Sequence, residues 1–183
     1  YSYIKGGGGL VHLQTQNVTS DVASVDFTSN IDSTYDSYKF VISDLKPATD
    51  SVNVRIQYGN SSDSFFTNNY GRAAIGRASG GSTQVISGNG SGNYGAEPNT
   101  ETIGNASDES FSAEFILSKP TATDTHKIVY GNAGFIDRDG SFVGSVFMGG
   151  QQNSVAAVDR LRIIMSSGNI ARGNFSMFGV VNS

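Results

Sequence analysis

The C-terminal part of the chain, from Val158 to Val180, alternates apolar and polar residues in a regular pattern. Leu161, Ile163 and Met165 are separated by polar or charged residues such as Arg162, and Ser167-Gly168-Asn169 interrupts the run before it resumes at residues 174–178. Successive side chains of a β-strand point to opposite faces, so this pattern predicts two strands of a sheet that has one buried and one solvent-exposed face. The pattern contains no reactive group, and it therefore constrains the fold more than the function.

The same alternation recurs along the chain. It is clearest at residues 52–58, where Val, Val, Ile and Tyr alternate with Asn, Arg and Gln. We also expect strands at residues 10–16, 22–27, 38–45, 84–87, 111–117, 126–136 and 141–148, with Asp139-Gly140 as a hairpin turn, and turns at 46–50 and 151–157. Residues 30–36 form a polar connection in which Asp and Ser could cap a short helical turn.

Roughly nine or ten short strands without a convincing amphipathic helix predict an all-β fold, an antiparallel β-sandwich with jelly-roll-like topology. At 183 residues we expect one such domain, residues 10–183. Residues 1–9, which contain the glycine run 6–9, read as an arm or linker to an upstream stalk.

The composition favours an extracellular particle surface. Charged residues make up 15% of the chain, against about 25% in an average protein, and Ser, Thr, Asn and Gly supply most of the polarity. The chain has no cysteine, which excludes disulfides and thiol chemistry. The net charge of −4 and the scattered basic residues argue against a nucleic-acid partner. No apolar run approaches the roughly 18 residues of a membrane helix, so we expect no membrane insertion.

Motifs for chemistry are weak. His12 and His126 belong to no metal-ligand motif, and residues 137–148 have Phe142 and Met148 at the positions where a calcium loop requires Gly and Glu. No serine lies in a Gly-x-Ser-x-Gly elbow, and the carboxylates Asp108, Glu109 and Glu114 reveal no cleft by themselves. We therefore expect no catalytic residue, no metal and no cofactor.

Carbohydrate recognition is the binding function that the residues favour. Carbohydrate-binding sites use aromatic faces together with amide and guanidinium groups. This mixture occurs between residues 65 and 72, and Tyr94 adds a further aromatic ring downstream. The candidate glycan- or receptor-binding residues are Phe65, Asn68, Asn69, Tyr70, Arg72 and Tyr94. For the two phenylalanines of this segment, Phe65 and Phe66, the interpretation that we favour is that they form core or subunit contacts. The Asn-x-Ser/Thr triplets at residues 17, 60, 89, 105 and 174 are expected by chance in a chain of this composition.

Several stretches resemble a β-domain that recurs in virion proteins of tailed phages and is common in marine phage and cyanophage sequences. They are residues 23–40 (ASVDFTSNIDSTYDSYKF), 46–50 (KPATD), 104–106 (GNA), 151–154 (QQNS) with 156–162 (AAVDRLR), and 166–180 (SSGNIARGNFSMFGV). The resemblance extends from about Leu10 onward and is weakest at residues 59–103. It implies an exposed structural module, at the end of a fibre or as an appended head or tail domain, without catalytic residues.

The leading hypothesis is thus a non-enzymatic virion surface protein, the head of a tail fibre or similar appendage that attaches to a host surface glycan or protein. We expect it to contact other virion proteins and to form a homo-oligomer, a trimer in which the subunits protect one another's strand edges. One alternative is a capsid decoration (cement) protein, and another is a glycan depolymerase.

Overall fold

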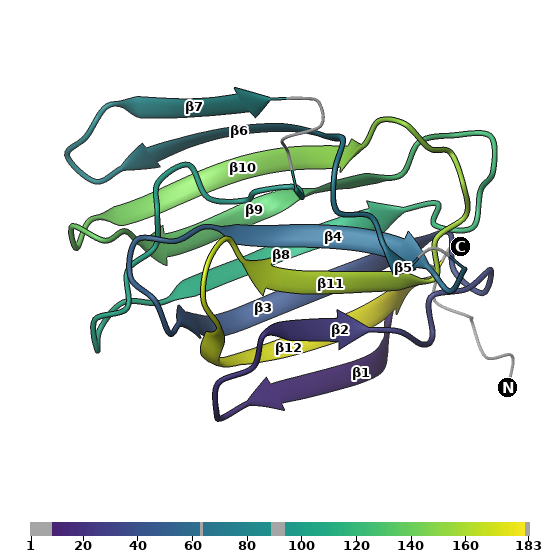
Figure 1. The fold of residues 1–183 in the computed structure, drawn as a ribbon, viewed down its shortest axis with the longest axis horizontal. Coiled ribbons are helices and arrows are strands. Elements are labelled where there is room, and N and C mark those ends of the chain that lie inside the picture. Colours follow the sequence, from purple (N-terminus) through teal and green to yellow (C-terminus); the bar gives the residue numbers. More distant parts are fainter. Residues whose placement is uncertain (1–8, 63, 89–93, 182–183) are drawn as a thin grey trace, which may run out of the picture.

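The computed structural model describes residues 9–62, 64–88 and 94–181, and these form twelve strands in two antiparallel sheets (Figure 1). The strands are β1 (Leu10–Val18), β2 (Ser24–Phe27), β3 (Ser37–Pro47), β4 (Val54–Asn60), β5 (Ser64–Phe65), β6 (Tyr70–Ala78), β7 (Thr83–Gly88), β8 (Phe111–Ser118), β9 (Ile128–Ile136), β10 (Phe142–Gln151), β11 (Arg160–Met165) and β12 (Ile170–Val180). The predicted all-β antiparallel sandwich is confirmed.

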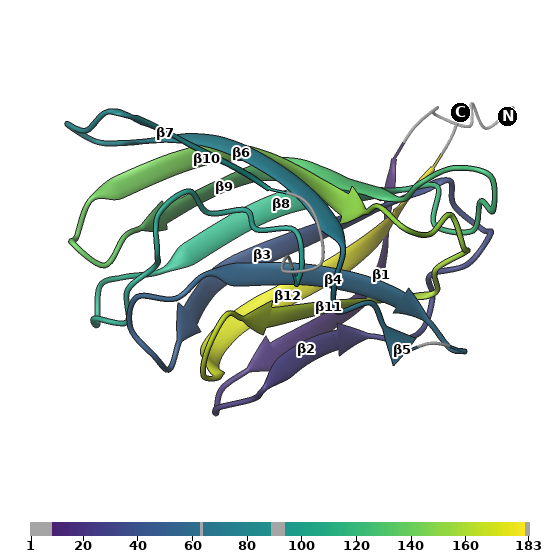
Figure 2. The same ribbon diagram turned by 45° about the horizontal axis from the view of Figure 1, so that its top comes forward.

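The two sheets differ in size. The larger has eight strands in the order β1-β12-β3-β8-β9-β10-β6-β7, and the smaller has four in the order β2-β11-β4-β5. They form two layers, with β7 at the free edge of the larger sheet extending beyond the smaller one (Figure 2). Neighbours such as β1 and β12, or β3 and β8, come from distant parts of the chain, so most of the pairing is non-local.

The core lies between the layers because the inward residues of both sheets are apolar. On β11, Leu161, Ile163 and Met165 are buried, as their spacing predicts. On β3 and β8, the rings of Phe40 and Phe115 stack with centroids 5.1 Å apart. Burying large side chains of this kind stabilises a fold by roughly 1.5–3 kcal/mol each.

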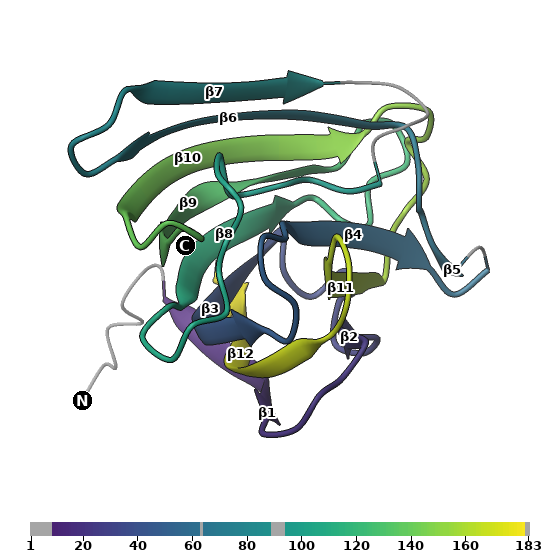
Figure 3. The ribbon, with the colours of Figure 1, turned by 60° about the vertical axis from the view of Figure 1, so that its left-hand side comes forward.

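The smaller sheet does not cover the whole inner face of the larger one. Residues 94–103 pass over the remainder as an irregular segment (Figure 3). Ala96 pairs with Ile56 of β4, and Ser145 Oγ of β10 donates a hydrogen bond to Pro98 O at 2.6 Å. This segment therefore extends the smaller sheet beside β4 and closes the core over β10.

The strand boundaries differ from the prediction mainly in the middle of the chain. β5 and β6 were not predicted, because β6 does not follow the simple rule of apolar residues inward and polar residues outward. Its inward positions include Arg72 and its outward positions include Ile75. The expected turn at residues 46–50 starts later, since β3 continues to Pro47, and residues 30–36 form hydrogen-bonded turns without a helical segment.

Two predicted turns are confirmed. Asp137 Oδ1 accepts hydrogen bonds from the backbone N–H groups of Asp139 (3.0 Å) and Ser141 (2.8 Å), which makes residues 137–141 the hairpin turn between β9 and β10. Gly168 connects β11 to β12 with a φ of 71°. Most of the expected arm at residues 1–9 and the triplet at Asn89 lie outside the described residues.

Candidate functional site

Phe65, the first predicted site residue, lies on the outer face of the smaller sheet. It pairs with Gly59 of β4, and Arg160 of β11 pairs with the same glycine from the other side. The guanidinium carbon of Arg162 lies 4.0 Å from the centroid of the Phe65 ring. A side chain at Gly59 would collide with the backbone of β5, so this glycine allows the phenylalanine and the arginines to meet. Phe65 is covered by guanidinium groups and not by the apolar core.

Tyr70 was predicted to lie at the binding surface, but the structure places it in the interior. It is fully buried, and its hydroxyl accepts a hydrogen bond from the Tyr58 backbone N–H at 3.0 Å. Burial raises the pKa of this phenol far above its ordinary value. The prediction that Tyr70 contacts a ligand is therefore wrong, because the ring begins β6 on its inward side and fills the space between the sheets.

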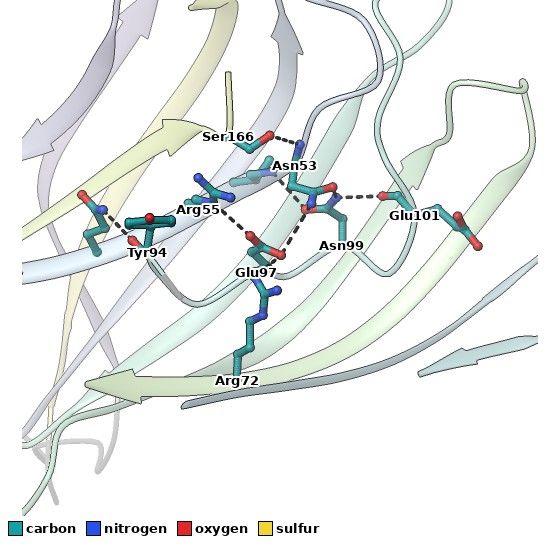
Figure 4. Close-up of polar contacts among 10 residues, drawn as sticks. Asn53, Arg55, Arg72, Tyr94, Glu97, Asn99, Glu101 and Ser166 are labelled. Carbon is teal, nitrogen blue, oxygen red and sulfur yellow. Dashed lines mark hydrogen bonds and ion pairs between the residues drawn. The ribbon is translucent and has the colours of Figure 1, made fainter. Parts of the chain in front are cut away.

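Glu97 connects Arg72 with Arg55, and Arg55 in turn contacts Tyr94 (Figure 4). Glu97 is buried, and its carboxylate forms ion pairs with Arg72 of β6 and with Arg55 Nε of β4, the latter at 2.9 Å. The Arg55 guanidinium lies over the Tyr94 ring, 5.4 Å from its centroid. Tyr94 itself is 48% exposed. One buried carboxylate thus connects both sheets to an exposed aromatic ring.

Asparagines hold the same segment against β4. The Asn99 side chain accepts a hydrogen bond from Val54 N at 3.0 Å and donates to Asn53 Oδ1 at 2.8 Å and to Glu101 O at 2.7 Å (Figure 4). A buried amide group satisfied in this way replaces the regular ladder that the segment lacks. Gln57 Nε2 of β4 also donates a hydrogen bond to the Tyr94 backbone carbonyl at 2.5 Å, so β4 helps to position Tyr94.

Asn68 and Asn69 lie in the short connection between β5 and β6. Asn69 has a positive φ of 58°, a conformation that asparagine adopts more readily than most residues. Its carbonyl accepts a hydrogen bond from Gln152 N at 2.8 Å, and its side chain bonds to Asn68. These two residues shape a loop and do not form a common surface with Phe65 through any contact seen in the described residues.

The structure therefore assembles a different set from the one predicted. We call the residues Arg55, Phe65, Tyr94, Arg160 and Arg162 the arginine–aromatic face; they lie along the outer face of the smaller sheet. Phe65 and Tyr94 were predicted, whereas the three arginines were not. Their alternation with buried residues showed that they face outward, but only the pairing of β4, β5 and β11 brings them to the two rings.

The arginines of this face are held in fixed orientations. Arg162 Nε and Nη2 donate to the two carboxylate oxygens of Asp26 at 2.7 and 2.5 Å, and the pKa of Arg162 is raised by these hydrogen bonds. This fork engages two of the five guanidinium N–H groups. A pre-oriented guanidinium beside an aromatic ring offers both hydrogen-bond donors and an apolar surface, the combination that a sugar ring or a polar peptide can use.

The outer face of the larger sheet is hollowed where β6, β9 and β10 meet. The hollow has a volume of about 770 Å³ and is lined by apolar Ile128 and Met148 and by polar Ser87, His126 and Gln152. Lys127 lies beside it with its ammonium group donating to Thr125 O (2.7 Å) and Val155 O (2.9 Å), and burial lowers the pKa of this lysine. That cation fixes two loops together.

The acidic and histidine side chains that were considered for catalysis form hydrogen bonds and ion pairs with neighbouring residues of the fold. Glu109 is buried and accepts a hydrogen bond from Ala106 N at 2.5 Å, while Glu114 forms an ion pair with Lys39 at 2.6 Å. His126 bonds to the Ser154 carbonyl and His12 to Thr15. Within residues 9–62, 64–88 and 94–181, no three His, Asp or Glu side chains are grouped to hold a metal ion. The same residues include no helix suited to crossing a membrane.

Comparison with protein-family models, with curated proteins and with solved structures found no match to this chain.

Proposed function

We propose that this protein is a non-enzymatic surface component of a tailed-phage virion, the head of a tail fibre or similar appendage that attaches the particle to a host envelope glycan or protein. The arginine–aromatic face is the attachment surface in this proposal. The observation that carries it is the placing of oriented guanidinium groups directly on two aromatic rings, one of them half exposed, on an outer face of a rigid sandwich.

Other features support an appendage that works outside the cell. The surface is poor in charge and rich in hydroxyl and amide groups, and the core is large enough to need no disulfide. Gly9 O accepts a hydrogen bond from Val181 N at 2.9 Å, so the chain enters the domain at the β1 edge of the sandwich. A shaft or another virion protein would join there, at the edge opposite β7.

The experiment is an adsorption assay with the purified protein and host cells. We expect the protein to bind the cells and, in excess, to block phage adsorption. Tyr94→Ala should weaken binding at least about tenfold, an energy of roughly 1.4 kcal/mol, because it removes the exposed ring beside Arg55. His12→Ala, which truncates an exposed ring on the other sheet, is the matched control and should bind normally. Equal binding by both variants contradicts the proposed surface.

A capsid decoration protein is the second candidate. It is favoured by the broad apolar area on the outer face of the larger sheet, which would suit contact with a shell. Copy number per particle separates the two functions. A decoration protein is present in hundreds of copies and stabilises the head, whereas a fibre head is present in few copies and its loss abolishes adsorption.

A further inference from the structure

The outer face of the eight-stranded sheet is divided into a polar half and an apolar half. Over β1, β12, β3 and β8 its side chains pair with one another, as in the ion pair Lys39–Glu114 (2.6 Å) and the hydrogen bonds Thr15–Ser176 (2.9 Å) and Asn174–Asn17 (2.6 Å). Over β9, β10, β6 and β7 the outward side chains are mainly apolar. We call this second part the apolar half.

Seven large apolar side chains stand out from the apolar half with exposed fractions between 40% and 68%: Ile75, Val85, Ile128, Tyr130, Phe142, Val146 and Met148. The strand register places five of them in two neighbouring rows, and Phe142 lies beyond the row that contains Gly134 and Gly144. Val146 lies opposite Ile75, which lies opposite Val85, and in the next row Tyr130 lies opposite Met148. The surface is thus one patch crossing four strands and not a scatter of single residues.

The size of the patch fits a stable protein contact. An aromatic side chain has roughly 150–250 Å² of surface and Val, Ile and Met have less, so these seven, which are about half exposed, together expose on the order of 700 Å². The largest apolar patch of an ordinary monomer is about 300–600 Å². A standard interface buries about 800 Å² on each partner. The apolar half is therefore close to the area that one subunit contributes to a specific interface.

Two glycines on this surface indicate that another backbone approaches it. Gly134 of β9 and Gly144 of β10 lie opposite each other at outward positions. A Cβ added to either would meet nothing within 4 Å, and neither has a positive φ. The fold of a single chain therefore does not require glycine at these positions. Glycine in a strand costs about 0.5–1 kcal/mol relative to alanine, and close approach of another backbone is one physical reason for placing it there.

The arrangement is complementary to itself. The Gly134–Gly144 pair leaves a strip of bare backbone, and Phe142, the most exposed of the seven side chains, projects directly beside it. Among the outward positions of β6, β7, β9 and β10, Arg77 is the charged one. A surface that is almost uncharged and carries a projection next to a recess can pack on a copy of itself without opposing like charges.

From these observations we propose that the apolar half is the contact between copies of this chain, with Phe142 of one subunit packed against the Gly134–Gly144 strip of its neighbour. This assigns a surface to the homo-oligomer that the proposed function expects. The expectation that the chain forms an oligomer rests on the proposed function, whereas the choice of contact surface rests on the observations above. It also leaves the arginine–aromatic face, on the opposite side of the sandwich, accessible in the oligomer.

The test is sedimentation of the purified full chain at micromolar concentration, with no host cell present. We expect the unmodified protein to sediment as an oligomer. Val146→Lys should raise the dissociation constant more than about tenfold, because it places a charge in a desolvated contact. Val41→Lys is the matched control: a valine at an outward position of the same sheet, in the polar half and opposite Glu114. This control should remain oligomeric.

Gly144→Val tests the recess without adding charge. Nothing within the chain obstructs a side chain there, so the isolated subunit should be as stable as before or more stable, while association weakens more than about tenfold. A monomeric unmodified protein overturns the proposal, as does an oligomer that tolerates both Val146→Lys and Gly144→Val. An unmodified protein that forms the oligomer but does not bind host cells would contradict the proposed function and leave this contact standing.

Discussion

At the scale of single residues, the fold depends on a few polar side chains that connect the two sheets. Tyr58 of the smaller sheet donates its hydroxyl proton to Lys127 O (2.9 Å) and accepts from Gln151 N (2.5 Å), both in or beside strands of the larger sheet. Tyr70 reaches in the opposite direction, from β6 to the backbone of Tyr58. Phenols are suited to this task because the ring fills the core while the hydroxyl satisfies buried backbone groups.

Replacing Tyr70 by phenylalanine should destabilise the protein by about 1–3 kcal/mol, because the Tyr58 N–H is then buried without its partner. Urea unfolding measures the change. Tyr94→Phe removes a hydroxyl from a ring that is 48% exposed and lies outside the apolar half, and it should change stability by less than about 0.5 kcal/mol. Equal effects of the two substitutions would show that the Tyr70 hydroxyl is not the structural link.

The same phenols predict alkaline sensitivity. Burial raises the pKa of Tyr58 to about 12 and also raises the pKa of Tyr38 and Tyr70, so the folded state favours their protonated forms. Their contribution is complete below about pH 10, the pKa of an unfolded tyrosine, and is lost as the pH rises towards 12. For Tyr58 alone the loss is about 2–3 kcal/mol. Unfolding free energies measured from pH 8 to 12 should be flat below pH 9 and then fall, with a shallower decline in Tyr70→Phe.

Glu97 gives a third prediction at this scale. Glu97→Gln removes the charge shared by Arg55 and Arg72 and should cost about 2 kcal/mol or more, since the carboxylate is buried. Glu114→Gln breaks an ion pair on the exposed sheet face and should cost less than about 1 kcal/mol. Thermal unfolding of both variants compares them. A larger loss for Glu114→Gln would mean that the inter-sheet network is not the stronger one.

At the scale of elements, the residues of a hairpin turn determine its backbone conformation, whereas tertiary contacts determine how much space surrounds it. Gly140 and Gly168 both have a positive φ, of 81° and 71°. Space around them differs: a Cβ at Gly140 would meet nothing within 4 Å, whereas one at Gly168 would collide with the Thr49 side chain. The first turn is exposed at the end of β9 and β10, and the second packs against the connection between β3 and β4.

This difference separates backbone strain from crowding. Gly140→Ala should cost about 1–2 kcal/mol, the energy of placing an ordinary residue in the left-handed region. Gly168→Ala carries the same strain together with the collision at Thr49 and should cost clearly more. Chemical denaturation of the two variants gives the comparison, and Gly168→Ala combined with Thr49→Ala, which removes the colliding hydroxyl oxygen, should recover part of the difference. Equal costs without such recovery would contradict the role of Thr49.

At the scale of the whole molecule, the two outer faces have different characters and suggest different partners. The smaller sheet presents charged groups held in fixed orientation, and one half of the larger sheet presents apolar side chains. The proposed division places host recognition on the first and self-association on the second. A protein that oligomerises through the second face presents several copies of the first, and linked copies bind a repeated host ligand more tightly than a single one does.

Much of this fold could be predicted from the sequence because most strands bury one face. Residues 54–60, 111–118 and 160–165 alternate accordingly, and local turn residues separate them. β6 could not be found in this way, since a strand whose outer face is apolar and whose inner face accepts Arg72 has no simple alternation. Of the predicted site residues, Phe65 and Tyr94 lie beside arginines on the outer face of the smaller sheet, whereas Tyr70 is buried in the interior.

The sequence by itself determined the all-β class, the positions of the turns and which side of most strands faces the core, because these follow from the two-residue period of a strand and from local turn chemistry. Only the tertiary structure decided which outward residues become neighbours. Arg162 and Phe65, or Val146 and Val85, are far apart in the chain, and non-local strand pairing with its exact register brings each set onto one face.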